Sequence, residues 1–130
     1  MRVSQKRHSD DIVRVSFLFH NYRKRRLVMW KEYQPNPVAR RVGDCSVRAI
    51  AKALDTDWET AYLMLTANGY SMGDVISSDA VWGATLRQHG FYKEVLPNEC
   101  PDCYNALDFC EDHPKGTYVL GFGGHVATIS

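Results

Sequence analysis

Two residues far apart in the sequence carry the side chains of a thiol–imidazole pair. Cys45 follows Gly43-Asp44 where a helix is expected to begin, and His125 follows Gly123-Gly124 in an expected strand. At a helix start, the dipole and the free backbone N–H groups favour a thiolate over a thiol and can hold a developing oxyanion. A histidine from elsewhere in the fold then stabilises the thiolate and protonates the leaving group. The pattern predicts Cys45 as nucleophile and His125 as base.

Each of these two residues also has a purely structural interpretation. A cysteine near the start of a helix is usually a small, buried apolar residue, and a histidine on a strand usually supports the fold or lies at the surface. The glycines before His125 favour the chemical interpretation, because backbone without side chains lets other groups approach closely. On the residues alone, both interpretations stay open.

A second set of residues has the types and spacing of a zinc site. Cys100, Cys103, Cys110 and His113 follow the pattern C-x2-C-x6-C-x2-H. Thiolate and imidazole ligands in this number suit tetrahedral structural zinc. The alternative is two loop cysteines and one helical cysteine that bind no metal. We expect no cofactor and keep zinc as the alternative.

The elements that must position these side chains follow from the apolar periodicity. Val47, Ile50, Ala51 and Leu54 share one helical face, and Asp44 is placed to cap that helix with its side chain. A second helix carries Trp58, Tyr62 and Leu65 on its buried face and stops at Asn68-Gly69. The remaining expected elements are a helix from Ser78-Asp79 to Gly90, a strand at 91–96, a helix at 105–112, and strands at 117–120 and 125–129. Helices come first and strands later, which indicates an α+β fold.

The first part of the chain is strongly basic. Residues 1–28 include the run Arg23-Lys24-Arg25-Arg26 near their end, and we expect them to form a basic N-terminal arm without fixed structure. An alternation of apolar residues from Val13 to Phe19 leaves a short strand as the alternative. A single basic cluster is a weak indication of nucleic-acid binding, which we keep open as a role of this arm.

The composition excludes several classes of protein. Hydrophobic residues make up 45% of the chain and the formal net charge is +1, so the chain is expected to fold as a globular domain. No apolar run approaches the ~20 residues that span a membrane, and no signal peptide is evident. We therefore expect a cytoplasmic protein without a membrane partner, whose cysteines are thiols.

The segments around Cys45 and His125 carry a longer pattern. Residues 43–51 read GDCSVRAIA, and residues 113–120 read HPKGTYVL and are followed by GGHV at 123–126. These segments resemble the nucleophile helix and the histidine-bearing hairpin of papain-like cysteine peptidases, in the small branch found in bacteria and phages. The resemblance extends over residues 29–130, which we expect to form one papain-like domain.

The resemblance implies a specific fold and chemistry. A helical half would pack on a small antiparallel sheet, and Cys45 would cleave peptide or isopeptide bonds of a protein or peptide substrate through an acyl-enzyme, with His125 as base. Such sites also use an amide side chain upstream of the cysteine to complete the oxyanion hole. Gln34 and Asn36 are the candidates.

One departure from the family pattern bears on activity. In papain-like enzymes an Asp or Asn on a later strand orients the histidine, and none lies between His125 and Ser130. The resemblance therefore implies a domain truncated at its C-terminus. Without an orienting partner the imidazole tautomer is poorly fixed, and activity is expected to fall. The alternative functions are a catalytically inactive papain-like module or a small zinc-binding interaction module.

Overall fold

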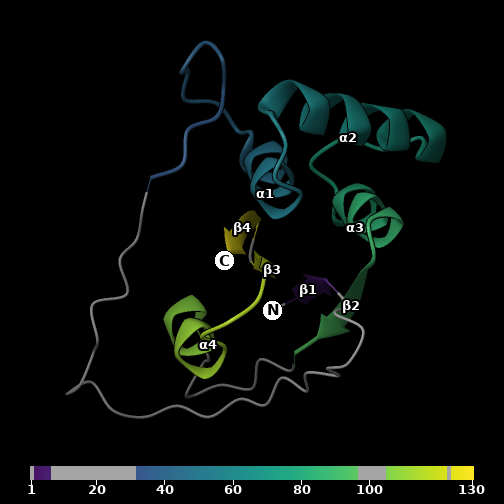
Figure 1. Cartoon of the computed structure of the whole chain (residues 1–130). Helices are drawn as coiled ribbons and strands as arrows, with labels where there is room; N and C mark the ends of the chain where they lie inside the picture. Colours follow the sequence, from purple (N-terminus) through teal and green to yellow (C-terminus); the bar gives the residue numbers. More distant parts are fainter. Residues whose placement is uncertain (1, 7–31, 97–104, 123) are drawn as a thin grey trace.

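A computed structural model describes residues 2–6, 32–96, 105–122 and 124–130 of the chain. The described part is an α+β structure, which confirms the expected fold class. Its helices are α1 (Cys45–Ala53), α2 (Trp58–Met72), α3 (Asp79–Gln88) and α4 (Ala106–Asp112). Its strands are β1 (Arg2–Lys6), β2 (Phe91–Val95), β3 (Tyr118–Phe122) and β4 (His125–Ile129) (Figure 1). Within these residues no helix is long and apolar enough to cross a membrane.

The second helix is longer than the sequence predicts. It runs through Gly69 to Met72 and ends where Gly73 adopts a left-handed conformation with φ of 67°. Gly69 is buried, and the chain after the helix turns back over it, so that the Asp74 amide donates to the Gly69 carbonyl at 2.9 Å. The expectation that Asn68-Gly69 stops this helix is therefore wrong. Glycine at position 69 admits a close backbone approach and does not end the helix.

The four described strands form one antiparallel sheet in the order β2-β1-β3-β4. The first residues of the expected basic arm, Arg2–Lys6, thus form an inner strand that pairs with β2 on one side and β3 on the other. Val3 and Ser4 are buried on it. The remainder of the arm, including the strand considered near Val13–Phe19, lies outside the described residues.

Helices cover both faces of this sheet (Figure 1). On one face, α1, α2 and α3 enclose an apolar core that includes Val119 of β3 and Val126 of β4. On the other face, Phe109 of α4 packs with a second apolar cluster of Val3, Leu96, Tyr118 and Leu120. The side chains that alternate along β3 and β4 therefore belong to different cores, and the face on which a residue lies decides which helices it meets.

Candidate functional site

Cys45 is the first residue of α1, as the sequence predicts. Its thiol is free and half-buried against the core formed by α1, α2 and α3. The first backbone amide of the helix with a described acceptor is that of Arg48, which donates to the Asp44 carbonyl at 2.9 Å. In the described part of the chain no hydrogen bond uses the amides of Cys45, Ser46 and Val47. These N–H groups can therefore donate hydrogen bonds to an anionic oxygen.

The side chain of Asp44 does not cap α1, although the residue occupies the capping position. It turns toward α2, where its Oδ2 accepts a hydrogen bond of 3.0 Å from the Trp58 indole N–H. Its Oδ1 lies 3.0 Å from the Arg48 Nε, but neither of these two buried atoms makes a hydrogen bond, so charge alone joins them. The expected side-chain cap is wrong because Trp58 and Arg48 engage the carboxylate. This leaves the amides of the first turn uncapped.

His125 begins β4, which packs against α1. Thr128 of this strand donates from its hydroxyl to the Ala49 carbonyl at 2.7 Å, and Val126 belongs to the core beneath α1. Because successive side chains of a strand point to opposite faces, His125 and Ile129 lie on the other face. Two contacts agree with this placement. Ile129 packs against the Phe109 cluster, and the His125 ring lies 5.6 Å from that of Phe122.

The structure thus places Cys45 and His125 on two elements that touch, without joining their side chains. In the part of the chain that is described, no hydrogen bond links the thiol to the imidazole. His125 is exposed, and β4 forms an edge of the described sheet. The imidazole therefore lies at an open corner of the sheet.

The two candidate oxyanion amides differ in position. The Gln34 Oε1 accepts from the Asn36 backbone amide at 3.2 Å, so this side chain serves the loop before α1. The Asn36 Oδ1 accepts from the Val38 amide at 3.0 Å. Asn36 is buried, and its side-chain amide N–H groups make none of the described hydrogen bonds. Asn36 therefore has a fixed side chain with a donor still available, whereas Gln34 does not line the space beside α1.

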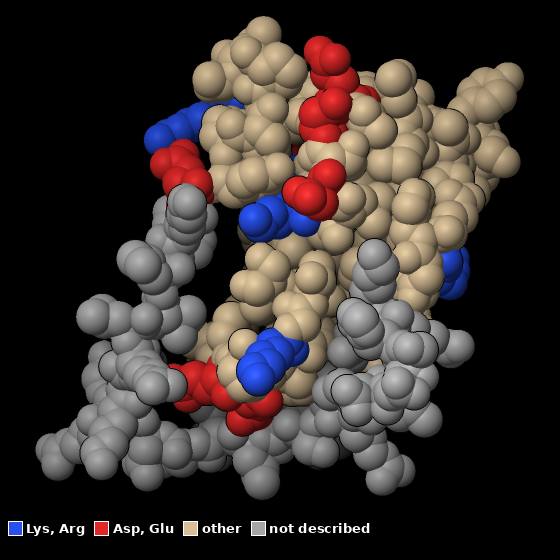
Figure 2. Space-filling model, in the orientation of Figure 1, with Lys and Arg blue, Asp and Glu red and all other residues tan. Residues whose placement is uncertain are grey.

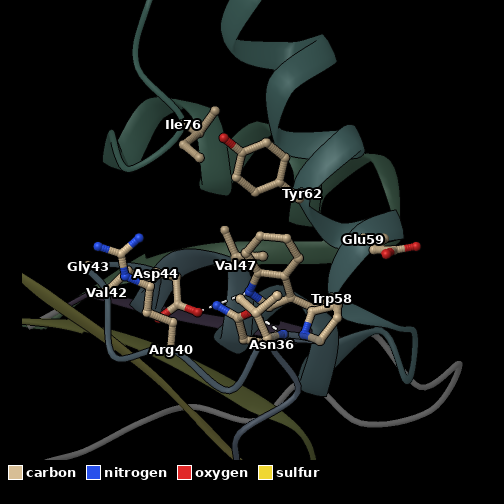
Figure 3. A pocket seen from close by; sticks show the side chains of 12 residues that line it. Asn36, Arg40, Val42, Gly43, Asp44, Val47, Trp58, Glu59, Tyr62 and Ile76 are labelled. Atoms are coloured by element: carbon tan, nitrogen blue, oxygen red, sulfur yellow. Dashed lines mark hydrogen bonds between the residues drawn. The ribbon is translucent and has the colours of Figure 1, made fainter.

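A cavity of about 540 Å³ lies between the loop 36–44 and the start of α2. Asn36, Gly43, Asp44 and the side chains of α2 line it, together with residues that approach from α1 and from the loop after α2 (Figure 3). Cys45 and His125 are not among the lining residues. The cavity therefore flanks the start of α1 on the side toward α2.

Trp58 and Tyr62 form an aromatic wall of this cavity that the sequence analysis missed. Their rings stack 4.9 Å apart at an angle of 26°. Tyr62 was expected on the buried face of its helix, but 39% of its surface is exposed. The one available signal was the spacing of two aromatic residues four positions apart at the start of a helix, which also fits simple core packing.

Only half of the proposed zinc set lies in the described structure. Cys110 is on α4, and His113 follows that helix, with its Nδ1 3.0 Å from the Phe109 carbonyl and its ring stacked on that of Phe109 at 4.1 Å. Cys100 and Cys103 lie outside the described residues. Among the residues described, no group of three or more His, Cys, Asp and Glu side chains is placed to hold a metal.

Comparison with known proteins assigns neither a family nor a function to this chain. No known protein family, curated protein or solved structure was found to match this chain. The function is therefore argued from the residues and their geometry.

Proposed function

We propose that this chain is a papain-like cysteine hydrolase that cleaves peptide or isopeptide bonds through an acyl-enzyme on Cys45, with His125 as the base. The observation that carries the proposal is the start of α1. Cys45 is its first residue, the Asp44 carboxylate is engaged by Trp58 and Arg48, and the first-turn amides are left without acceptors. A thiolate and a developing oxyanion are both favoured by such a helix end.

The reaction follows from these groups. The Cys45 thiolate attacks the carbonyl carbon and forms a C–S bond, while the first-turn backbone amides and the Asn36 side-chain amide N–H donate to the oxyanion. The His125 imidazolium gives its proton to the leaving amine as the C–N bond breaks. Water then attacks the thioester carbonyl carbon while His125 takes a proton from it, and the C–S bond breaks as the acid is released, which restores the Cys45 thiolate and the His125 imidazolium.

Catalysis by this pair requires the His125 side chain, at the start of β4, to move. Because the His125 ring lies on the face away from α1, it must pass around the sheet edge to reach Cys45. His125 is exposed at the first position of the edge strand, after Gly124 with φ of 79°. A side chain at the end of an edge strand has room for such a movement, which a central strand would not give.

A second candidate is a binding module on the same fold that lacks catalysis. The observation that favours it is the placement of His125 on the sheet face opposite to Val126 and Thr128, the residues that contact α1 and its core. In that case Cys45 is a half-buried apolar residue without special reactivity. The cytoplasmic location expected from the sequence suits either candidate, since reduced thiols persist there.

Alkylation of the native protein with iodoacetamide at mildly acidic pH separates the two candidates. The hydrolase requires Cys45 to react at least about tenfold faster than Cys110, Cys100 and Cys103, because only a thiolate attacks the reagent. The four rates are read by mass spectrometry of the digested protein. Equal rates at all four cysteines would support the binding module and contradict the hydrolase.

A further inference from the structure

We infer that the cavity beside α1 binds an apolar, ring-sized side chain of the substrate, next to the bond that Cys45 attacks. The link to Cys45 rests on the proposed function, whereas the binding of such a group does not. Cavities of about 300–1,000 Å³ typically hold small ligands. At about 540 Å³, this cavity has room for one large side chain and the amide next to it.

The walls of the cavity select an apolar group with a polar end. Figure 3 shows Tyr62 and Ile76 on one side of the space and Asn36 and Asp44 on the other, with Val47 and Trp58 between them. Stacked aromatic rings and branched aliphatic side chains favour a planar or branched apolar group. On the opposite side, the Asn36 side-chain amide N–H can donate to a carbonyl oxygen of the substrate backbone.

Charged side chains of both signs line the cavity, so its apolar walls, and not its charge, select the bound group. Both oxygens of the Asp44 carboxylate are engaged, by Trp58 and by Arg48, and the Glu59 side chain points away from the space in Figure 3. Figure 2 shows acidic side chains over the helical part of the molecule, with basic side chains beside them, and the exposed residues between the end of α1 and the start of α2 include Asp55 and Glu59. Arg40, an exposed lining residue of opposite charge, stands at the same cavity as Glu59, so the charges there exclude neither an acidic nor a basic end on the bound group.

Gly43 leaves open space at the cavity, close in the sequence to Cys45. It lines the cavity two positions before the cysteine, and an added Cβ would meet no atom within 4 Å. Its φ lies outside the left-handed region, so neither packing nor backbone conformation requires a glycine there. The missing side chain instead keeps the start of α1 uncovered. A substrate backbone can therefore pass over Gly43 between the cavity and the thiol.

Two alkylating reagents test the inference on the full chain. Iodoacetamide and 2-iodo-N-(2-phenylethyl)acetamide react alike, since the sulfur forms a C–S bond as iodide leaves, and they differ only in the phenyl group. For each cysteine we define a ratio, the alkylation rate constant with the phenylethyl reagent divided by that with iodoacetamide. This ratio measures how much the phenyl ring accelerates alkylation. We expect this ratio at Cys45 to exceed the ratio at Cys110 by about tenfold, as burial of an aromatic ring implies.

Two tyrosines of α2 provide a matched pair of variants. Tyr62→Ala removes a wall of the cavity and should bring the Cys45 ratio close to that of Cys110. Tyr70→Ala removes the same side chain from a position that is 91% exposed and outside the cavity, and it should leave the ratio unchanged. Gly43→Leu, which the backbone accommodates, should also lower the ratio by filling the open space at Gly43. Circular dichroism establishes that each variant is folded.

The outcomes separate this inference from the proposed function. Equal ratios at Cys45 and Cys110, or a high ratio at Cys45 that Tyr62→Ala does not change, would overturn the cavity as the binding site. If Cys45 then still reacts fast with iodoacetamide itself, only the inference fails. Slow reaction of Cys45 with iodoacetamide, together with a high ratio that depends on Tyr62, would support the cavity and contradict the hydrolase.

Discussion

The side chain of Asp44 joins the start of α1 to α2. It is 6% exposed, and its two oxygens face the Trp58 indole and the Arg48 guanidinium. By turning away from the helix that it precedes, this carboxylate leaves the first-turn amides of α1 available. One buried residue therefore supports both the packing of two helices and the chemistry proposed at Cys45.

Replacing Asp44 should destabilise the fold measurably. Asp44→Ala leaves the Trp58 N–H without its acceptor and the Arg48 charge without its partner, which should lower the free energy of unfolding by about 2 kcal/mol. Asp44→Asn retains an oxygen for Trp58 and should cost less. Urea denaturation measures both variants, and a wild-type midpoint for Asp44→Ala would show that these contacts contribute nothing.

Cys110 should react at higher pH than an exposed thiol. Burial raises the pKa of the Cys110 thiol, and the adjacent Glu111 carboxylate raises it further. Because the pKa is raised, the Cys110 thiolate forms at higher pH than the thiolate of an exposed cysteine. Alkylation near neutral pH is therefore slow in the native state. Urea should shift the profile of rate against pH to lower pH. Coinciding native and denatured profiles would contradict the burial effect.

Among the elements, the helix starts could be predicted because their signals are local. The apolar face of α1 and the capping residues Asp57 and Ser78 come from neighbouring positions in the chain. The end of α2 is harder to predict, because Asn68-Gly69 and Gly73 are both local stop signals, and the turn that packs over Gly69 decides between them. The direction of the Asp44 side chain could not be predicted, because its hydrogen-bond partner Trp58 lies in another helix.

Replacing each of two helical glycines by alanine should change the free energy of unfolding in opposite directions. At Gly69 an added Cβ would lie 2.8 Å from the Asp74 carbonyl oxygen, so Gly69→Ala should destabilise by about 1–3 kcal/mol. At Gly83 of α3 the nearest atom is 3.5 Å away, at the end of the flexible Arg87 side chain. Gly83→Ala should therefore stabilise by about 0.5–1 kcal/mol. Urea denaturation of both variants checks the signs, and a stabilised Gly69→Ala would refute the close approach.

At the scale of the whole molecule, the sheet depends on strands that are distant in sequence. β1 lies between β2 and β3, and its Arg2 forms an ion pair with Asp79 at the start of α3. A five-residue strand near the N-terminus has no local signal for such partners. The face of His125 was also beyond sequence reasoning. Val126, Ala127 and Ile129 make both faces of β4 apolar, and a shift of one residue exchanges the faces.

The inner position of β1 can be tested with a matched pair of valines. Val3 on β1 is 2% exposed, whereas Val95 on the edge strand β2 is 65% exposed. Val3→Asp buries a carboxylate without a partner and should lower the free energy of unfolding by about 3 kcal/mol or more. Val95→Asp should change it little. Thermal unfolding followed by circular dichroism compares them, and equal midpoints would contradict the place of β1 in the sheet.

The pairing of Cys45 with His125 is tested most directly by the rate of Cys45 alkylation with iodoacetamide across pH, in the wild type and in His125→Ala. His89→Ala, which removes an imidazole at the end of α3, is the control. The proposed pair predicts that wild type and His89→Ala stay reactive at mildly acidic pH, whereas His125→Ala reacts there at least about tenfold more slowly. Coinciding profiles of rate against pH for wild type and His125→Ala would contradict the pair.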